Sequence, residues 1–252
     1  MSGRCCTFVV LMVTKQYLTS PCCSFNFQSA TASPWPSSHF DDDVAFVDPD
    51  RRRNLGGTAG VNNWSNDEFA VKIKNFADNN GIYGCGIIAH SQGGLAALHL
   101  RARYHSCLDN ASSGTRLIQS VGSPYQGTPL AAGIAALGEV FGAGCGSNND
   151  LTPDGADTWL ATIPTSARQD VYYYTTKFSD SGKWWVNDYC NFWSDLVLSD
   201  PEDGTVEDSK GQLPSGNNMG LTSGQCHTTG MTDDPQYEDQ GRNTFMNNNA
   251  RF

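Results

Sequence analysis

Residues 87–98 read IIAHSQGGLAAL, and this stretch decides the fold that we expect for the chain. Two β-branched residues lead into small and polar ones, and a run of helix-forming residues follows. Ser91 therefore lies where a buried strand turns into a helix. Ala89 and Gly93, two positions before and after it, are small, as a sharp strand-to-helix turn requires. The pattern predicts a nucleophile elbow, which projects a serine hydroxyl from the C-terminal edge of a sheet; the structural alternative is an ordinary strand-to-helix turn.

The helix predicted after Ser91 supports this interpretation. Its first backbone N–H groups and the positive end of its dipole would face the serine hydroxyl. The N–H of Gln92 is then a candidate oxyanion-hole donor, which would stabilise negative charge as it develops on a substrate carbonyl oxygen.

Strands and helices alternate along the chain. We expect strands within 43–50, 85–91, 116–124 and 170–178, and helices after the capping box at 65–68, within 93–105 and 130–144, and weakly within 243–252. Such alternation implies an α/β fold with a mostly parallel central sheet and helices on both faces.

The N-terminal part has a different character. Arg4 and the following CCTFVVLMV are typical of the basic and apolar parts of a short signal peptide, or else form a first core strand. Residues 20–40 are rich in Ser, Pro and Ala. We therefore expect an N-terminal segment over 1–42, signal-like or irregular, and a single catalytic domain over 43–252. No apolar run is long enough to span a bilayer, so we expect no integral membrane segment.

Charge and cysteine content narrow the class of protein. The net charge is −10, with 16 basic and 26 acidic residues, which gives no electrostatic reason to bind nucleic acid. The nine cysteines form no CxxC pair and show no zinc spacing. They predict one or two disulfides and a secreted or periplasmic protein, although several could be buried free thiols. We expect neither a metal nor a cofactor, and the sequence indicates no oligomeric state.

Two motifs carry a resemblance to a known family. AHSQGG at 89–94, followed by SPYQGTP at 123–129, resembles the lipases and esterases of the α/β-hydrolase superfamily, and bacterial secreted triacylglycerol lipases in particular. The resemblance covers about residues 43–230. It implies the α/β-hydrolase fold, with a small lid segment inserted at about 130–164, and an ester-hydrolase activity.

The resemblance also implies a substrate pocket. His90, Tyr125, Leu130 and Ile134 are its expected lining residues. Leu130 and Ile134 begin an apolar stripe, which would cover an acyl chain if it formed the lid or would pack inward if it were a core helix.

A serine nucleophile needs a general base and an acid that orients the base. In this fold the order along the chain is Ser, then Asp or Glu, then His. His227 is the histidine that follows Ser91 at a distance, whereas His99 and His105 lie on or just past the helix after the elbow. The resemblance implies an acid in an Asp-Gly-x-Val stretch, and Asp203-Gly204-Thr205-Val206 matches it. Asp200 is the fallback, and the predicted triad is Ser91, Asp203 and His227.

The sequence departs from the family at two points. Similar lipases carry a His-Gly pair after an early strand, where the next residue supplies the second oxyanion donor, and this chain has no His-Gly pair. If 7–13 is that early strand, Thr14, Lys15 or Gln16 would occupy the loop. Related lipases bind calcium through an Asp two residues after the histidine, and Thr229 stands there.

A triad of Ser, Asp and His occurs in proteins of several functions. The first expectation is a serine carboxylic ester hydrolase, a lipase or esterase that acts on lipids or small esters through an acyl-enzyme. An aliphatic polyester depolymerase uses the same triad in an open cleft. A catalytically impaired binding protein that keeps the fold is the alternative from another class, and the missing His-Gly pair favours it.

Overall fold

The main sheet of the molecule is mostly parallel. The computed structural model describes residues 10–13, 44–47, 65–79, 86–104, 116–131, 149–179, 197–227 and 233–250. Six described strands form the main sheet in the order β2-β1-β3-β4-β5-β6. They are β1 (Val10–Val13), β2 (Val44–Val47), β3 (Gly86–His90), β4 (Ile118–Val121), β5 (Val171–Lys177) and β6 (Asn217–Ser223). Strands β3 to β6 are parallel to one another, while β1 is antiparallel to both of its neighbours. The predicted α/β fold is confirmed.

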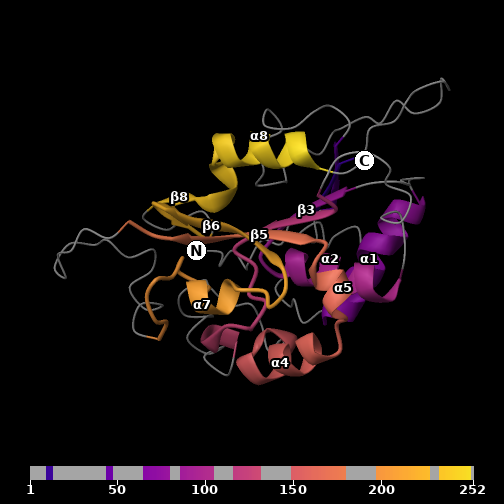
Figure 1. Ribbon diagram of the computed structural model, residues 1–252, viewed down its shortest axis with the longest axis horizontal. Helices are drawn as coiled ribbons and strands as arrows, with labels where there is room; N and C mark the ends of the chain where they lie inside the picture. Colours follow the sequence, from indigo (N-terminus) through magenta and orange to yellow (C-terminus); the bar gives the residue numbers. More distant parts are fainter. Residues whose placement is uncertain are drawn as a thin grey trace, which may run out of the picture.

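Helices lie on both sides of this sheet (Figure 1). Helix α8 covers one side, and α1, α2, α4, α5 and α7 lie on the other. The helices are α1 (Asn66–Asn79), α2 (Gln92–Arg103), α4 (Pro153–Ala161), α5 (Thr165–Arg168), α7 (Asp208–Gly211) and α8 (Gln240–Asn249). Short 3-10 turns are η3 (Pro129–Ala131), η4 (Asn149–Leu151) and η5 (Gln236–Glu238), and a small parallel pair joins β7 (Gln225–Cys226) to β8 (Asp234–Pro235).

Strand β3 is buried on both faces, and this explains its unbroken apolar sequence. Ile87 and Ala89 belong to the core cluster that α1 and α2 complete, whereas Ile88 packs in a second cluster with Tyr237 and Met246 on the α8 side. Successive side chains of a strand point to opposite faces, so the elbow at the end of β3 is fixed by packing on both sides.

Helix α1 begins at the predicted capping box. The Glu68 N–H donates to Oγ of Ser65 (3.1 Å), and the Ser65 N–H donates to the Glu68 carboxylate (2.9 Å). Its apolar side, with Phe69 and Ile73 fully buried, packs against α2. The capping box and the helical spacing of the apolar residues are therefore confirmed.

The region expected to form a lid is only partly described. Residues 132–148, which include Ile134, lie outside the described residues. The part from 149 to 164 forms η4 and α4 and is attached to the body of the fold. The N–H of Thr128 donates to the Leu151 carbonyl (2.8 Å), and the N–H of Asn66 donates to Oδ2 of Asp150 (2.7 Å). Trp159 of α4 is buried in the main core, so the described part of this region packs as a core helix does.

The N-terminal strand belongs to the main sheet, although residues 1–42 were expected to be a separate segment. Val10 pairs with Ala89 and Val13 pairs with Gly86. The interpretation of this stretch as a strand therefore holds for 10–13. Among the helices that the structure describes, none has the length and apolarity that crossing a bilayer would need.

Candidate active site

Ser91 sits on a strained turn between β3 and α2. Its backbone has φ 55° and ψ −134°, in the left-handed region of φ that a residue with a side chain rarely adopts. Strain of this kind costs about 1–3 kcal/mol and persists only where the surroundings impose it. Here the Ser91 N–H donates to the Val121 carbonyl of β4 (3.1 Å), and the Ser91 carbonyl accepts from the N–H of Gly94 (3.1 Å). Although Ser91 is the N-cap residue of α2, its side chain makes no capping bond.

The tightest packing beside the elbow occurs at Gly94. A Cβ atom at this position would lie 2.2 Å from Oγ of Ser123 and 2.9 Å from the hydroxyl of Tyr125. The motif analysis singled out Ala89 and Gly93 as the positions that must be small. The structure adds Gly94, because the first turn of α2 presses this residue against the segment that follows β4.

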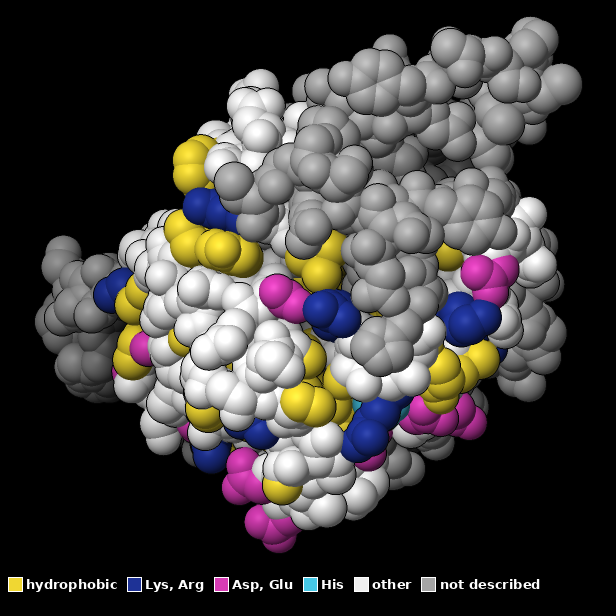
Figure 2. Space-filling model, turned by 45° about the vertical axis from the view of Figure 1, so that its right-hand side comes forward, with side chains coloured by type: hydrophobic (Ala, Val, Ile, Leu, Met, Phe, Trp, Pro, Cys, Tyr) yellow, Lys and Arg dark blue, Asp and Glu magenta, His cyan; other side chains and the backbone are white. Residues whose placement is uncertain are grey.

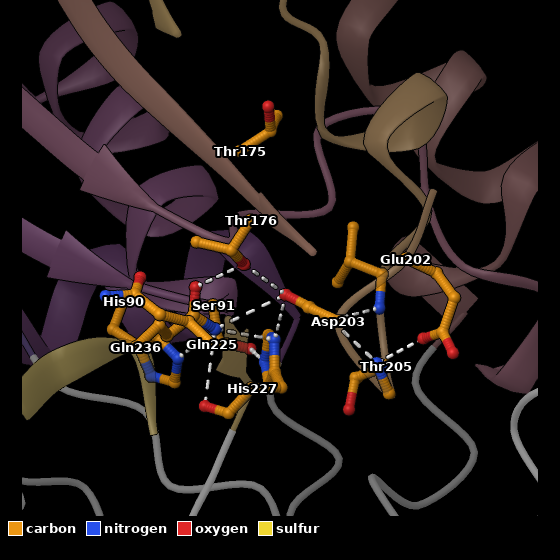
Figure 3. A network of polar contacts seen from close by, with 12 residues as sticks. His90, Ser91, Thr175, Thr176, Glu202, Asp203, Thr205, Gln225, His227 and Gln236 are labelled. Carbon is orange, nitrogen blue, oxygen red and sulfur yellow. Dashed lines mark hydrogen bonds and ion pairs between the residues drawn. The ribbon is translucent and has the colours of Figure 1, made fainter. Parts of the chain in front are cut away.

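The structure brings the three predicted triad residues together (Figure 3). Oγ of Ser91 lies 2.9 Å from Nε2 of His227, and Nδ1 of His227 lies 2.9 Å from Oδ2 of Asp203. All three side chains are at most 3% exposed, so these contacts are shielded from bulk water. Polar interactions strengthen in such surroundings. The arrangement can transfer a proton from the serine hydroxyl to an imidazole that a carboxylate orients.

Asp203 is held by the turn that follows it. Its Oδ1 accepts from the N–H groups of Thr205 (3.0 Å) and Val206 (2.7 Å). Gly204 has φ +90°, which its lack of a Cβ atom permits. The N–H of His227 donates to the Asp203 carbonyl (2.7 Å), so a backbone bond also joins the acid and the base. The fallback acid, Asp200, is exposed.

Two buried polar residues behind this triad were not anticipated. The side-chain amide of Gln236 lies against His227 and Asp203, and the hydroxyl of Thr176 lies 3.0 Å from Oδ2 of Asp203. Thr176 lies near the end of the predicted strand 170–178, and polar residues at the carboxyl ends of parallel strands commonly line sites. That signal was available in the sequence. Gln236 gave no signal, because it follows the polar stretch Asp233-Asp234-Pro235 and reaches the site only through tertiary packing.

Two of the expected pocket residues are buried within the fold. Tyr125 is fully buried in the main core, where its hydroxyl is hydrogen-bonded to that of Ser120 (2.8 Å). Burial raises the pKa of Tyr125. His90 is also fully buried, and its ring lies 4.7 Å from the ring of His227 on the α8 side of the sheet. Both side chains support the site from within the fold and do not line a surface pocket. Leu130 is half-buried in η3, and Ile134 is not described.

Gln92, the candidate for the first oxyanion donor, has a defined place. Gln92 is the first residue of α2, and its side-chain amide donates to Oδ1 of Asn66 (3.2 Å), toward α1. Its backbone N–H lies directly after the nucleophile, as an oxyanion donor must.

The loop considered for the second donor does not fit. β1 runs antiparallel to β3, so Val13 pairs with Gly86 at the edge of the sheet remote from Ser91. Thr14, Lys15 and Gln16 follow Val13 and lie outside the described residues. The direction of β1 argues against them, and the second donor is unassigned among the described residues.

His99 belongs to a separate polar cluster. Its Nε2 lies 3.1 Å from Oδ1 of Asp67, and its Nδ1 accepts from Nε1 of Trp159 (2.9 Å). The donor at Nδ1 places the imidazole proton on Nε2. Burial lowers the pKa of His99, and the nearby Asp67 offsets this only in part. His99 links α1, α2 and α4 and takes no part in the triad.

The described residues form no metal site, and the face drawn in Figure 2 shows no patch of like charge. No group of three or more His, Cys, Asp or Glu side chains in the described ranges is arranged to hold a metal ion. Acidic and basic side chains are interspersed on the face shown in Figure 2. Cys226, next to His227, is disulfide-bonded, and this confirms that the chain forms at least one disulfide.

Two comparisons by sequence point to the same family. The family of the conditioned medium factor C-terminal domain matches residues 27–250. Conditioned medium factor of Dictyostelium discoideum is 39% identical over 217 residues, which are 86% of this chain and 29% of that protein. The chain therefore spans less than a third of the length of this relative.

Solved structures give more distant likenesses. A metagenomic carboxyl esterase has a TM-score of 0.47 at 18% identity, with 74% of this chain and 58% of that chain covered. The mature form of a Bacillus licheniformis lipase has a TM-score of 0.44 at 16% identity, with 63% and 64% covered. Likenesses this distant do not bear on the chemistry of the site.

Proposed function

We propose that this chain, which belongs to the conditioned medium factor C-terminal domain family, is a serine carboxylic ester hydrolase. In this proposal Ser91 is the nucleophile, His227 the general base and Asp203 the residue that orients His227. The observation that carries the proposal is the pair of 2.9 Å contacts that links the Ser91 hydroxyl through the His227 ring to the Asp203 carboxylate.

The mechanism follows from these contacts. A neutral imidazole that accepts the Ser91 proton at Nε2 carries its own proton on Nδ1, which it donates to Asp203. Ser91 Oγ attacks the ester carbonyl carbon, and the Gln92 N–H stabilises the oxyanion. The imidazolium then gives its proton to the departing alcohol. A water molecule, deprotonated by His227 in the second half of the reaction, hydrolyses the acyl-enzyme.

The strain at Ser91 also supports the proposal. A hydroxyl at an N-cap position ordinarily accepts a bond from the first turn of the helix, and this makes the helix more stable. Ser91 forgoes that bond, adopts an unfavourable backbone conformation and aligns its hydroxyl with His227. Strain of this kind clusters at active sites.

The finer substrate class is part of the proposal. A small ester or lipid ester is the first choice, and an aliphatic polyester is the alternative within the same chemistry. We also propose that the protein acts outside the reducing cytosol, because the disulfide at Cys226 needs an oxidising compartment.

A series of p-nitrophenyl esters of increasing acyl length tests the proposed function. We expect purified wild-type protein to hydrolyse members of the series and Ser91→Ala to lose about 10⁴–10⁶-fold in kcat. Ser123→Ala, which removes another buried serine hydroxyl beside the elbow, is the matched control and should retain activity. Hydrolysis that is equal in wild type and Ser91→Ala, or absent from both, would contradict the proposal.

One observation favours a catalytically impaired binding protein. No second oxyanion donor is assigned among the described residues, and loss of one such donor lowers kcat by about 10²–10³-fold. This alternative predicts that wild type hydrolyses every ester in the series only slightly faster than Ser91→Ala, or no faster.

A further inference from the structure

We propose that Gln236 is a positioning residue that keeps His227 in the tautomer able to accept the Ser91 proton. The inference rests on the proposed function and concerns the same site. Gln236 is the first residue of η5 and is fully buried beside the His227 ring. Figure 3 shows its side chain among those of His90, Thr176 and the triad.

The amide nitrogen of Gln236 has several acceptors within reach. It lies 2.9 Å from Nε2 of His90, 2.9 Å from Nδ1 of His227, 3.4 Å from Oδ2 of Asp203 and 3.3 Å from the His227 carbonyl. An amide nitrogen has only two protons to donate. The choice among these acceptors determines which nitrogen of His227 carries the imidazole proton.

Donation to Nδ1 of His227 would be incompatible with catalysis. A neutral imidazole that accepts at Nδ1 carries its proton on Nε2, and it would then donate to Ser91 instead of accepting from it. When the amide protons go to His90 and Asp203, Nδ1 keeps its own proton and donates it to Asp203. His90 and Asp203 together then accept both amide protons, and none is left for Nδ1 of the catalytic imidazole.

The carbonyl end of the Gln236 amide is anchored on β5. Oγ1 of Thr176 lies 2.9 Å from Oε1 of Gln236 and 3.0 Å from Oδ2 of Asp203, so its single proton is shared between these two acceptors. In this arrangement the amide oxygen faces Thr176 and the amide nitrogen faces the two imidazoles.

The space for this amide depends on a glycine. Gly122, just after β4, has φ +57°, and a Cβ atom there would lie 2.4 Å from Oε1 of Gln236. The amide therefore lies in a place shaped by the ends of β3, β4 and β5. This arrangement distinguishes it from a polar side chain that is buried only for packing.

Gln236→Met tests the proposal, with Gln119→Met as the matched control. Gln119 of β4 is also fully buried, and its amide donates to the Met246 carbonyl of α8 (2.6 Å), away from the triad. We expect Gln236→Met to lower kcat about 10²-fold with KM unchanged, because small displacements of a catalytic group have effects of this size. Gln119→Met should lower the unfolding temperature and leave kcat unchanged.

Rescue at Thr176 gives a second kinetic measurement. Thr176→Val removes the hydroxyl and should lower kcat, whereas Thr176→Ser keeps the hydroxyl and should restore most of it. If Gln236→Met keeps its kcat, or if Gln119→Met loses as much, the positioning role is wrong while the proposed function stands.

Proton NMR separates this inference from the proposed function. We expect wild-type protein to show a strongly deshielded imidazole proton that disappears in Asp203→Asn, shifts in Gln236→Met and is unchanged in Gln119→Met. If the protein shows these NMR signals but hydrolyses no ester, the positioning role of Gln236 holds and the proposed ester-hydrolase activity is wrong. An unshifted proton in Gln236→Met would overturn the positioning role.

Discussion

The backbone conformation of Ser91 links the sequence motif most directly to the proposed chemistry. Its positive φ turns the hydroxyl from the helix end toward His227, and neighbouring residues must be small for the turn to form. The strain is imposed by close packing of the first turn of α2 against the segment after β4. Substitutions that add atoms to that packing should therefore affect both stability and the nucleophile.

Gly94→Ala tests this packing. The added Cβ would lie 2.2 Å from Oγ of Ser123, so the elbow must shift, and we expect a loss of about 1–3 kcal/mol in the free energy of unfolding. Urea denaturation measures the loss, and ester hydrolysis should fall with it. Gly241→Ala in α8 is the control, since its Cβ would meet only Oδ1 of Asp239 at 3.5 Å. Replacement of a helical glycine should be neutral or stabilising there, and equal losses in both variants would contradict the account.

At the scale of single residues, the sequence predicted some members of the candidate site and not others. Ser91, Asp203 and His227 could be named because their residue types suit acyl transfer, while the resemblance implied their order and local motifs. The burial of Tyr125 and His90 within the fold could not be foreseen, because adjacency to a motif does not reveal on which face of the sheet a side chain packs. Gln236 could not be found, since its contact with His227 depends on the path of the chain between β8 and α8.

The element scale shows how α2 is held in place. His99, near the C-terminal end of α2, contacts Asp67 of α1 and Trp159 of α4. Because Nδ1 of His99 accepts the indole proton, protonation of this nitrogen breaks the bond to α4. Helices α1, α2 and α4, which support the elbow, are therefore joined at His99 by a contact that depends on pH.

The pH dependence of stability tests this contact. Burial lowers the pKa of His99 below its ordinary value of 6.5, so below pH 6.5 the unfolded chain binds a proton more readily than the folded one. The stabilisation is complete above pH 6.5 and is lost as the pH falls toward the folded pKa. The slope for one proton is at most about 1.4 kcal/mol per pH unit.

Urea denaturation across pH 4–8 measures this effect in wild type and His99→Gln. We expect the variant to be less stable at pH 8 and to lose less stability than wild type on acidification. If the free energy of unfolding of wild type falls no more steeply than that of His99→Gln between pH 6.5 and 5, His99 does not contribute to the pH dependence of stability.

Elements with strong local signals were predicted, and those without them were not. Helix α1 and strands β3, β4 and β5 follow from a capping box or apolar runs. β6 was missed, because its sequence NNMGLTS has few β-branched residues and lies on an edge of the described sheet, where burial imposes no pattern. The orientation of β1 was also not predictable, since strand direction depends on connections and not on side-chain pattern.

At the scale of the whole molecule, residues from distant parts of the chain converge at the C-terminal edge of the parallel strands. Ser91 follows β3, Thr176 lies near the end of β5, and Asp203 and His227 come from later loops (Figure 3). A parallel sheet brings successive strand ends to one edge, so this convergence is a property of the fold. Disruption of the loop that bears His227 should therefore affect the site without disrupting the sheet.

The disulfide at Cys226 tests how much this loop contributes to stability and to the site. Cys226 precedes His227, and its bonding cysteine lies outside the described residues. We expect Cys226→Ser to lower the free energy of unfolding by about 2–5 kcal/mol and to lower ester hydrolysis. A reducing agent should destabilise wild type more than Cys226→Ser. Equal sensitivity of both proteins to the reducing agent would contradict a stabilising role.

Covalent labelling of Ser91 is the most direct test of the central claim that the triad makes this hydroxyl a nucleophile. Wild-type protein is treated with a fluorophosphonate, and intact mass and peptide mapping locate the adduct. The account predicts one adduct per chain at Ser91, absent from Ser91→Ala and strongly slowed in His227→Ala. An unlabelled wild-type protein, or labelling that persists unchanged in His227→Ala, would contradict it.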